Sequence, residues 1–138
     1  MSQSFVADCS IGIGWIHPAQ STELTNRLLE VAESGVLVQV PAIWHLEIAN
    51  ALLVMVRRKL ISEPHRQVGL ALLGRLRLAV DDETSNLAFS TISDLAAKHS
   101  LSAYDASYLE LAKRKSLALA SRDEPLLAAA RKNGIKIL

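Results

Sequence analysis

Apolar residues in this chain gather in short continuous runs that alternate with longer stretches of helical spacing. A short run that is apolar throughout is typical of a strand buried on both faces, as in a parallel sheet whose strands are joined by helices. Runs of this kind, interrupted only by Gln39 and Lys136, predict strands at residues 5–7, 36–40, 78–80, 117–120 and 135–138. Helical spacing predicts helices at about 22–34, 43–59, 64–76, 84–99, 101–115 and 123–133. We therefore expect an α/β fold with helices on both faces of a parallel sheet.

Local signals predict where some of these elements begin and end. Ser21 is expected to cap the helix at 22–34, and Gly35 to end it. Residues 8–10 are expected to form a turn, and Gly12 and Gly14 to loosen the stretch that follows. The helix at 43–59 is apolar over most of its circumference.

The composition predicts a single domain over residues 1–138 whose core is mostly aliphatic. The chain has 138 residues, half of them hydrophobic and only 4% aromatic. Its 15 Lys and Arg against 14 Asp and Glu give no global basic excess, so nucleic-acid binding would need a local basic patch. No signal peptide or membrane span is recognised, which predicts a cytoplasmic protein without membrane contact. The single cysteine, Cys9, excludes an internal disulfide, and no Cys/His spacing resembles a zinc site.

Four carboxylates stand at positions in the chain that are expected to meet at one edge of such a sheet. Asp8 follows the first predicted strand, and Asp123 lies just beyond the strand at 117–120. Glu47 is in the second turn of the helix after the second strand, and Asp105 is in the first turn of its own helix. Ligands of open parallel sheets bind outside the carboxyl ends of the strands, so all four side chains are expected in one cleft.

For three of these acids the sequence also allows a purely local structural role in place of a shared site. Asp8 suits a turn after a strand, and Asp123 suits the N-cap of the following helix. Ser102 and Asp105 resemble a capping box, so Asp105 either caps its own helix or faces a cation. A carboxylate on the apolar stripe that Asp105 shares with Tyr108 is costly unless it is paired.

Glu47 is the hardest of the four to explain locally. It lies on a nearly all-apolar helix with no cation at i±3 or i±4, and Asn50 is its expected partner. Four converging carboxylates would repel one another unless a divalent cation joined them, and Mg²⁺ and Mn²⁺ prefer such oxygen ligands. A metal of this kind supports phosphodiester hydrolysis. Neither a Ser–His or Cys–His nucleophile pair nor a glycine-rich phosphate loop has comparable support in the sequence.

Taken in order, the motifs around these acids resemble the PIN-domain ribonucleases, and more closely the VapC toxins of toxin–antitoxin modules. The resemblance covers the whole chain. The motifs are Asp8 after an N-terminal strand, Pro41-x5-Glu47-x2-Asn50, Leu101-Ser102-Ala103-Tyr104-Asp105-Ala106 and Leu119-Ala120-Ser121-x-Asp123. Cys9 departs slightly, since family members often carry Ala or Thr there, and it is interpreted as a small buried residue.

The resemblance implies a three-layer α/β/α sandwich with a central, mostly parallel sheet. It implies a Mg²⁺- or Mn²⁺-dependent endoribonuclease, the toxin of a type II toxin–antitoxin system, that forms a homodimer and is blocked by a VapB-like antitoxin. Asp8 and Asp105 would be direct metal ligands, while Glu47 and Asp123 would complete the shell or orient the attacking water. Ser121 takes the small hydroxyl position before the last acid.

RNA phosphates would be contacted by local basic residues. Arg122 and the triplet Arg57-Arg58-Lys59 are the candidates, with solvated surface charge as the alternative for the triplet.

Two other classes of protein remain as alternatives. A phosphoacceptor receiver-like domain also has acids at strand ends, but it needs a second acid where Cys9 stands and a lysine after the last strand. A non-catalytic PIN-like module that only binds another protein would keep the fold without the activity. Intact acids at all four positions favour the enzyme.

Overall fold

Four short parallel strands form the centre of the computed structural model, which describes residues 3–138. The strands are β1 (Phe5–Ala7), β2 (Val38–Val40), β3 (Leu78–Val80) and β4 (Ala118–Ala120), in the spatial order β3-β2-β1-β4. Their registers pair Phe5 with Val38 and with Ala118, and Val38 with Leu78. The predicted parallel sheet is confirmed by these pairings, and the fully apolar β1 is buried at its centre.

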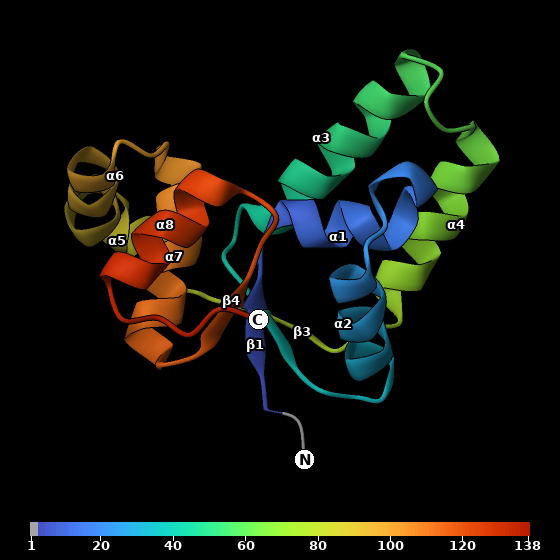
Figure 1. Cartoon of the computed structure of the whole chain (residues 1–138). Helices are drawn as coiled ribbons and strands as arrows, with labels where there is room; N and C mark the ends of the chain where they lie inside the picture. The colour runs from blue at the N-terminus through green and yellow to red at the C-terminus, as the bar shows by residue number, and fades with distance from the viewer. Residues whose placement is uncertain (1–2) are drawn as a thin grey trace.

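Helices cover the sheet on both sides. They are α1 (Cys9–Ile16), η1 (Pro18–Gln20), α2 (Glu23–Glu33), α3 (Trp44–Arg57), α4 (Glu63–Gly74), α5 (Thr84–Leu87), η2 (Ala88–Ile92), α6 (Ser93–His99), α7 (Ala103–Lys115) and α8 (Glu124–Lys132). Figure 1 shows α1 to α4 on one side of β1 and α5 to α8 on the other. This is the α/β/α sandwich that was expected. No helix among residues 3–138 is both long and apolar enough to cross a membrane.

The chain reverses its direction of winding between β1 and β4. Strands β1, β2 and β3 are laid down in one direction, whereas β4 returns to the opposite flank of β1. Such a reversal opens a crevice at the carboxyl ends of the two strands that flank it. Asp8 directly follows β1 and Asp123 follows β4, so both stand beside this crevice.

Residues 8–16 differ from the expected turn and loosened stretch. Helix α1 begins at Cys9 because Asp8 is its N-cap and accepts the amide N–H of Ile11 at 3.2 Å. Gly12 does not loosen this helix: a Cβ there would lie 2.6 Å from Ile48 Cδ1. Glycine instead permits the close approach of α1 to α3.

Two smaller expectations were also wrong. Thr22, not Ser21, caps α2, because Thr22 and Thr25 form a reciprocal capping box. Residues 135–138 do not form a strand and make a single bridge between Ile137 and Leu119. Gly35 ends α2 with φ 102°, as expected of a helix stop.

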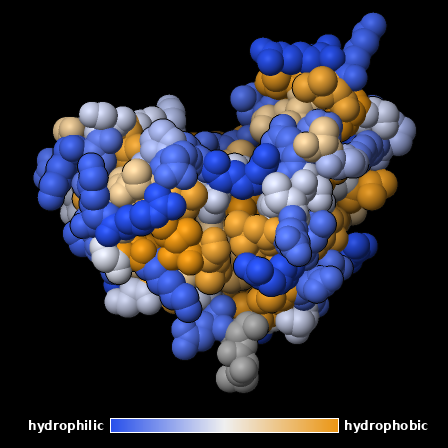
Figure 2. Space-filling view, viewed as in Figure 1, coloured by the Kyte–Doolittle hydropathy of each residue, from blue (hydrophilic) through white to orange (hydrophobic). Residues whose placement is uncertain are grey.

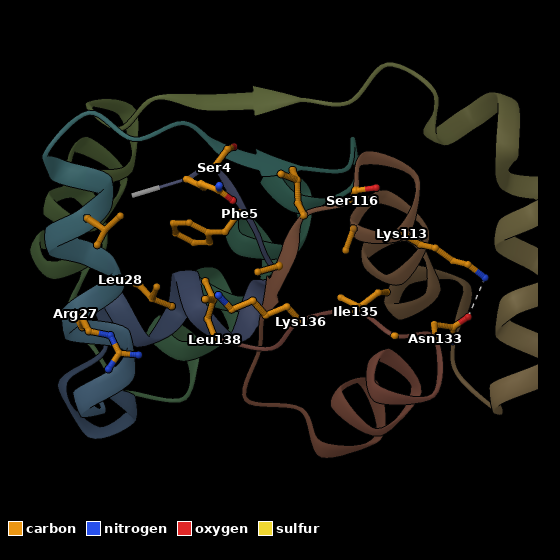
Figure 3. Close-up of a pocket in the computed structure, with 16 residues that line it drawn as sticks. Ser4, Phe5, Arg27, Leu28, Lys113, Ser116, Asn133, Ile135, Lys136 and Leu138 are labelled. Atoms are coloured by element: carbon orange, nitrogen blue, oxygen red, sulfur yellow. Dashed lines mark hydrogen bonds between the residues drawn. The ribbon is translucent and has the colours of Figure 1, made fainter. Parts of the chain in front are cut away.

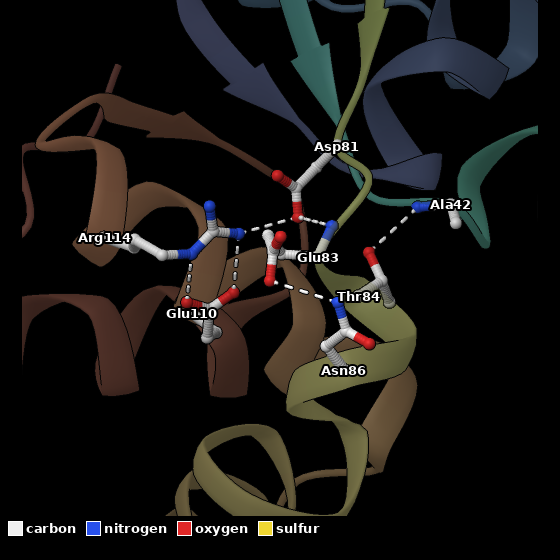
Figure 4. Close-up of polar contacts among 7 residues, drawn as sticks. All are labelled: Ala42, Asp81, Glu83, Thr84, Asn86, Glu110 and Arg114. Carbon is white, nitrogen blue, oxygen red and sulfur yellow. Dashed lines mark hydrogen bonds and ion pairs between the residues drawn. The ribbon is translucent and has the colours of Figure 1, made fainter.

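A buried ion cluster joins α7 to the end of β3 (Figure 4). Arg114 contacts Asp81 at 2.6 Å and Glu110 at 2.7 Å, and the side chains of both acids are at most 5% exposed. The two carboxylates raise the pKa of the Arg114 guanidinium, through hydrogen bonds first and charge second. This cluster, which the sequence did not predict, ties the helix that carries Asp105 to the sheet.

Candidate active site

The four predicted acids come from four different elements and face one cleft at the carboxyl edge of the sheet. Figure 1 shows α1 and α3 on one side of the carboxyl end of β1 and α7 and α8 on the other, and Figure 2 shows the surface hollowed between these two groups of helices. Burial raises the pKa of Asp105 and of Glu47, and neighbouring charges add to the rise: those of Asp123 and Asp8 for Asp105, and those of Asp105 and Asp8 for Glu47. We call Asp8, Glu47, Asp105 and Asp123 the carboxylate cluster.

Among the described residues, the Asp8 carboxylate accepts more hydrogen bonds than those of the other three acids. Its Oδ1 accepts hydrogen bonds from the Ser10 hydroxyl at 2.6 Å and from the Ile11 amide, and its Oδ2 accepts one from the Ser121 hydroxyl at 2.5 Å. Burial raises the pKa of Asp8, the hydrogen bonds lower it in part, and the charge of Asp123 adds to the rise. Ser121 occupies the hydroxyl position that the resemblance implied, whereas Ser10 was not predicted.

The same two hydroxyls also orient the loop that carries Asp123. Ser10 Oγ accepts the amide N–H of Arg122 at 2.8 Å, and Ser121 Oγ accepts the amide N–H of Asp123 at 2.9 Å. Asp123 occupies the N-cap position of α8, but its side chain makes no capping hydrogen bond. Its carboxylate is therefore left for the cleft.

The structure separates the two roles that the sequence left open for Asp105, since among the described residues its carboxylate makes no capping hydrogen bond. Ser102 Oγ accepts the amide N–H of Asp105 at 3.0 Å, so Ser102 is the N-cap of α7. The half-buried carboxylate belongs to the cluster, since its pKa is raised first by burial and then by the charge of Asp123. Ser102 therefore stabilises the turn that aims Asp105 into the cleft.

We expect Ser102→Ala to lower the free energy of unfolding by about 1 kcal/mol, because the Asp105 amide loses its capping acceptor. Chemical denaturation measures the change. Ser90→Ala is the control, since Ser90 is exposed in η2 and its hydroxyl makes no hydrogen bond within the described part of the chain. Equal stability of the two variants would contradict a capping role for Ser102.

Glu47 has a different partner from the one expected. Tyr108 on α7 donates its hydroxyl to Glu47 Oε1 at 2.5 Å. Asn50 is exposed, and within residues 3–138 its side chain makes no hydrogen bond, so that prediction was wrong. Burial raises the pKa of Glu47, the Tyr108 hydrogen bond lowers it in part, and the neighbouring acids add to the rise. The available sequence signal was the helical stripe that Tyr108 shares with Asp105.

Cys9 lies beside the carboxylate cluster without a chemical role of its own. Burial raises the pKa of the Cys9 thiol to about 12, and the charges of Glu47, Asp8 and Asp105 contribute. A thiol with this pKa stays protonated at neutral pH and is a poor nucleophile and metal ligand. The interpretation of Cys9 as a small buried residue is met only in part, because Cys9 is intermediate in exposure.

The carboxylate cluster has the donor chemistry of a hard-cation site. Among residues 3–138 every ion pair involves other acids, so none of the four carboxylates has a cation within 4 Å. Oxygen donors in this number suit Mg²⁺ or Mn²⁺. In the same range no three His, Cys, Asp or Glu side chains are arranged to hold a metal as they stand. Binding would therefore require side-chain rotations within the cluster.

The candidate phosphate contacts lie at different distances from the cluster. Arg122 is exposed next to Asp123, and its guanidinium donates to Gln20 Oε1 at 3.3 Å. The triplet 57–59 lies at the far end of α3 from Glu47, where positive charge stabilises the helix terminus. Arg122 is the basic residue that the fold brings to the cleft.

A hollow of about 820 Å³ lies at the opposite edge of the sheet (Figure 3). It is lined by Phe5 and Ala118, which begin their strands, and by Lys113, whose Nζ donates to Asn133 Oδ1 at 3.0 Å. Lys113 stands in the last turn of α7, where it compensates the helix dipole. None of the four cluster acids lines this hollow, so it is separate from the candidate active site.

Comparison with solved structures identifies the same fold over nearly the whole chain. PAE2754 from Pyrobaculum aerophilum superposes with a TM-score of 0.67 at 19% identity, covering 99% of this chain and 92% of that one. FitAcB from Neisseria gonorrhoeae gives 0.64 at 20% identity, covering 97% and 96%. FitAB bound to an IR36 DNA fragment gives 0.61 at 19% identity, covering 97% and 93%. No protein-family model and no curated protein sequence matches the chain.

Fold and site together define a class: an α/β/α protein with a central parallel sheet and acidic residues at the carboxyl edge of that sheet. The fold predicted from the sequence motifs is thereby confirmed. At about one-fifth identity, the comparison concerns the fold, and the chemistry must be argued from this chain's own residues.

Proposed function

We propose that this protein is a PIN-domain, VapC-type endoribonuclease that uses Mg²⁺ or Mn²⁺ and acts as the toxin of a type II toxin–antitoxin system. The observation that supports this most is the carboxylate cluster itself. Acids on α3 and α7 and after β1 and β4 influence one another's pKa, and within the described chain none of the four has a cationic partner. Such an arrangement is costly for a fold and is relieved by a divalent cation.

Each residue has a role in this proposal. Asp8 and Asp105 would hold the metal, which when bound would polarise a phosphate oxygen and lower the pKa of a water molecule. Glu47 and Asp123 would complete the ligand set or accept a proton from the attacking water. Ser10 and Ser121 keep Asp8 oriented through their hydrogen bonds. Arg122 would contact an RNA phosphate at the rim of the cleft.

The direct test is cleavage of structured RNAs by the purified protein. We expect cleavage with Mg²⁺ or Mn²⁺, none with EDTA, and recovery when the metal is restored. Asp8→Asn should be inactive under all three conditions, because it loses a charged metal ligand. Cleavage that survives both EDTA and Asp8→Asn would contradict the proposal.

The partners of the proposed toxin follow from the same assignment. FitAB, which shares this fold, was solved bound to a DNA fragment. We propose that this chain pairs with a VapB-like, DNA-binding antitoxin, forms a homodimer and acts in the cytoplasm. Expression of the chain alone should arrest growth, and Asp8→Ala or co-expression of the neighbouring small reading frame should relieve the arrest. Unchanged growth on expression of the wild-type chain would argue against a toxin.

One observation favours a second candidate, a non-catalytic PIN-like module that only binds another protein. Over residues 3–138 no three candidate side chains are already arranged as metal ligands. Calorimetric titration with Mn²⁺ separates the two functions. Binding that is lost in Asp8→Asn supports the nuclease, and the absence of heat with the wild-type protein supports the binding module.

A further inference from the structure

The hydrogen bond between Tyr108 and Glu47 joins the two helices that face each other across the cleft. Tyr108 lies on α7 and Glu47 on α3, 61 residues apart, and the hydroxyl oxygen is 2.5 Å from Glu47 Oε1. In the described part of the chain neither side chain has another hydrogen-bond partner. Each polar group thus depends on the other.

Tyr108 is the rigid member of the pair. Its side chain is fully enclosed, with 1% of the residue exposed, and it is among the largest buried side chains of the core. A tyrosine hydroxyl is protonated at neutral pH, and here it donates to Glu47. A packed aromatic ring with a protonated hydroxyl presents a donor at a fixed point in space.

Glu47 is the adaptable member. It is only half-buried and carries a long side chain that would otherwise sample several rotamers. The Tyr108 hydroxyl takes Oε1, while Oε2 has no hydrogen-bond partner among the residues that the structure describes. One carboxylate oxygen is therefore anchored and the other is free to act in the cleft.

Tyr108 also links the position of Glu47 to that of Asp105. Tyr108 follows Asp105 by three residues on α7, so both lie on the same face of one helix. The Arg114 cluster holds this helix against the end of β3. The position of the Tyr108 hydroxyl therefore defines how far Glu47 lies from Asp105.

We propose that Tyr108 is a positioning residue that fixes the Glu47 carboxylate in the cleft, and thereby sets where Glu47 meets the divalent cation or the attacking water. The inference rests on the proposed nuclease function and adds to it a residue outside the acidic set. Tyr108 acts through Glu47 and contacts neither metal nor substrate.

The test is a double-mutant cycle of Tyr108→Phe and Glu47→Gln, with Tyr104→Phe as the matched control. Tyr104 lies on the same helix one turn earlier and is 60% exposed. Tyr108→Phe should lower kcat about 10- to 100-fold, as is typical when a residue that orients a metal-site carboxylate is lost. KM for RNA should change little, and Mn²⁺ affinity measured by calorimetry should fall. In the Glu47→Gln background, Tyr108→Phe should lower neither kcat nor Mn²⁺ affinity further.

Each outcome decides the inference. A Tyr108→Phe variant with wild-type kcat and Mn²⁺ affinity would overturn it while leaving the proposed function in place. A loss of the same size in the Glu47→Gln background would also overturn it, since Tyr108 would then act through packing. A wild-type protein that neither cleaves RNA nor binds Mn²⁺ would overturn the proposed function, and this inference with it.

Discussion

Replacing Asp105 by asparagine should abolish RNA cleavage while leaving the fold intact. The substitution keeps the size of the side chain and the amide that Ser102 caps, but it removes one charge from the carboxylate cluster. A lost metal ligand should lower the cleavage rate more than about 100-fold, beyond the usual effect of losing a residue that merely orients a ligand. Mn²⁺ affinity should fall in parallel, as calorimetry would measure.

The same variant should make the metal-free protein more stable, and the gain should depend on pH. Burial and neighbouring charge raise the pKa of Asp105 in the folded state. An acid with a raised folded pKa costs stability as pH rises from its unfolded pKa to its folded pKa, because over that range the unfolded chain releases its proton more easily; above it the cost is constant. Asparagine has no such cost. The difference in free energy of unfolding should therefore be small below the ordinary aspartate pKa, grow as pH rises, and disappear when Mn²⁺ saturates the wild-type protein.

A suitable control is Asp94→Asn, since Asp94 is an exposed acid in the first turn of α6. It should leave cleavage and metal affinity unchanged. If Asp105→Asn instead unfolded the protein while any folded fraction kept wild-type metal affinity, Asp105 would be a capping residue and not a member of a metal site.

Replacing Arg114 by methionine should cause the largest loss of stability among these variants, about 3 kcal/mol. Methionine fills much of the arginine volume but leaves Asp81 and Glu110 as buried carboxylates without a cation. An unpaired buried charge costs far more than a surface ion pair contributes. Urea unfolding measures the loss.

Two comparisons make the Arg114 prediction specific. Arg131→Met breaks the exposed pair with Glu124 and should cost less than about 1 kcal/mol. Combining Arg114→Met with Asp81→Asn and Glu110→Gln should recover part of the stability, because the buried charges are then gone. If Arg114→Met cost no more than Arg131→Met, the Arg114 cluster would not anchor α7.

The sequence alone predicted the features that depend on neighbouring residues in the chain. The strand at 5–7 was located because a strand buried on both faces has no polar position, and the strand at 78–80 by a similar apolar run, although β3 lies at the edge of the sheet and is only partly buried. Ser102 was identified as a cap because a capping hydroxyl lies three residues before the amide that it satisfies. The positions of the four acids relative to strand ends followed from the same local patterns.

Features that depend on how helices approach one another could not be obtained in this way. Gly12 was interpreted as a source of looseness, although its lack of a Cβ is what lets α1 pack on α3. Asn50 lies one turn from Glu47 on the same helix, yet it points to solvent, and the partner comes from α7. A hydrogen bond across 61 residues depends on the packing of two helices on one sheet, which no local pattern encodes.

The sequence by itself thus determined an α/β fold with a parallel sheet and an acid at each of four strand-end or helix-start positions. These properties follow from burial and from the short-range geometry of strands and helix caps. Only the tertiary structure decided the strand order that sets Asp8 beside Asp123, the Tyr108 anchor of Glu47 and the Arg114 cluster behind α7. Each of these joins residues far apart in the chain, and their distances are set by the packing of whole elements.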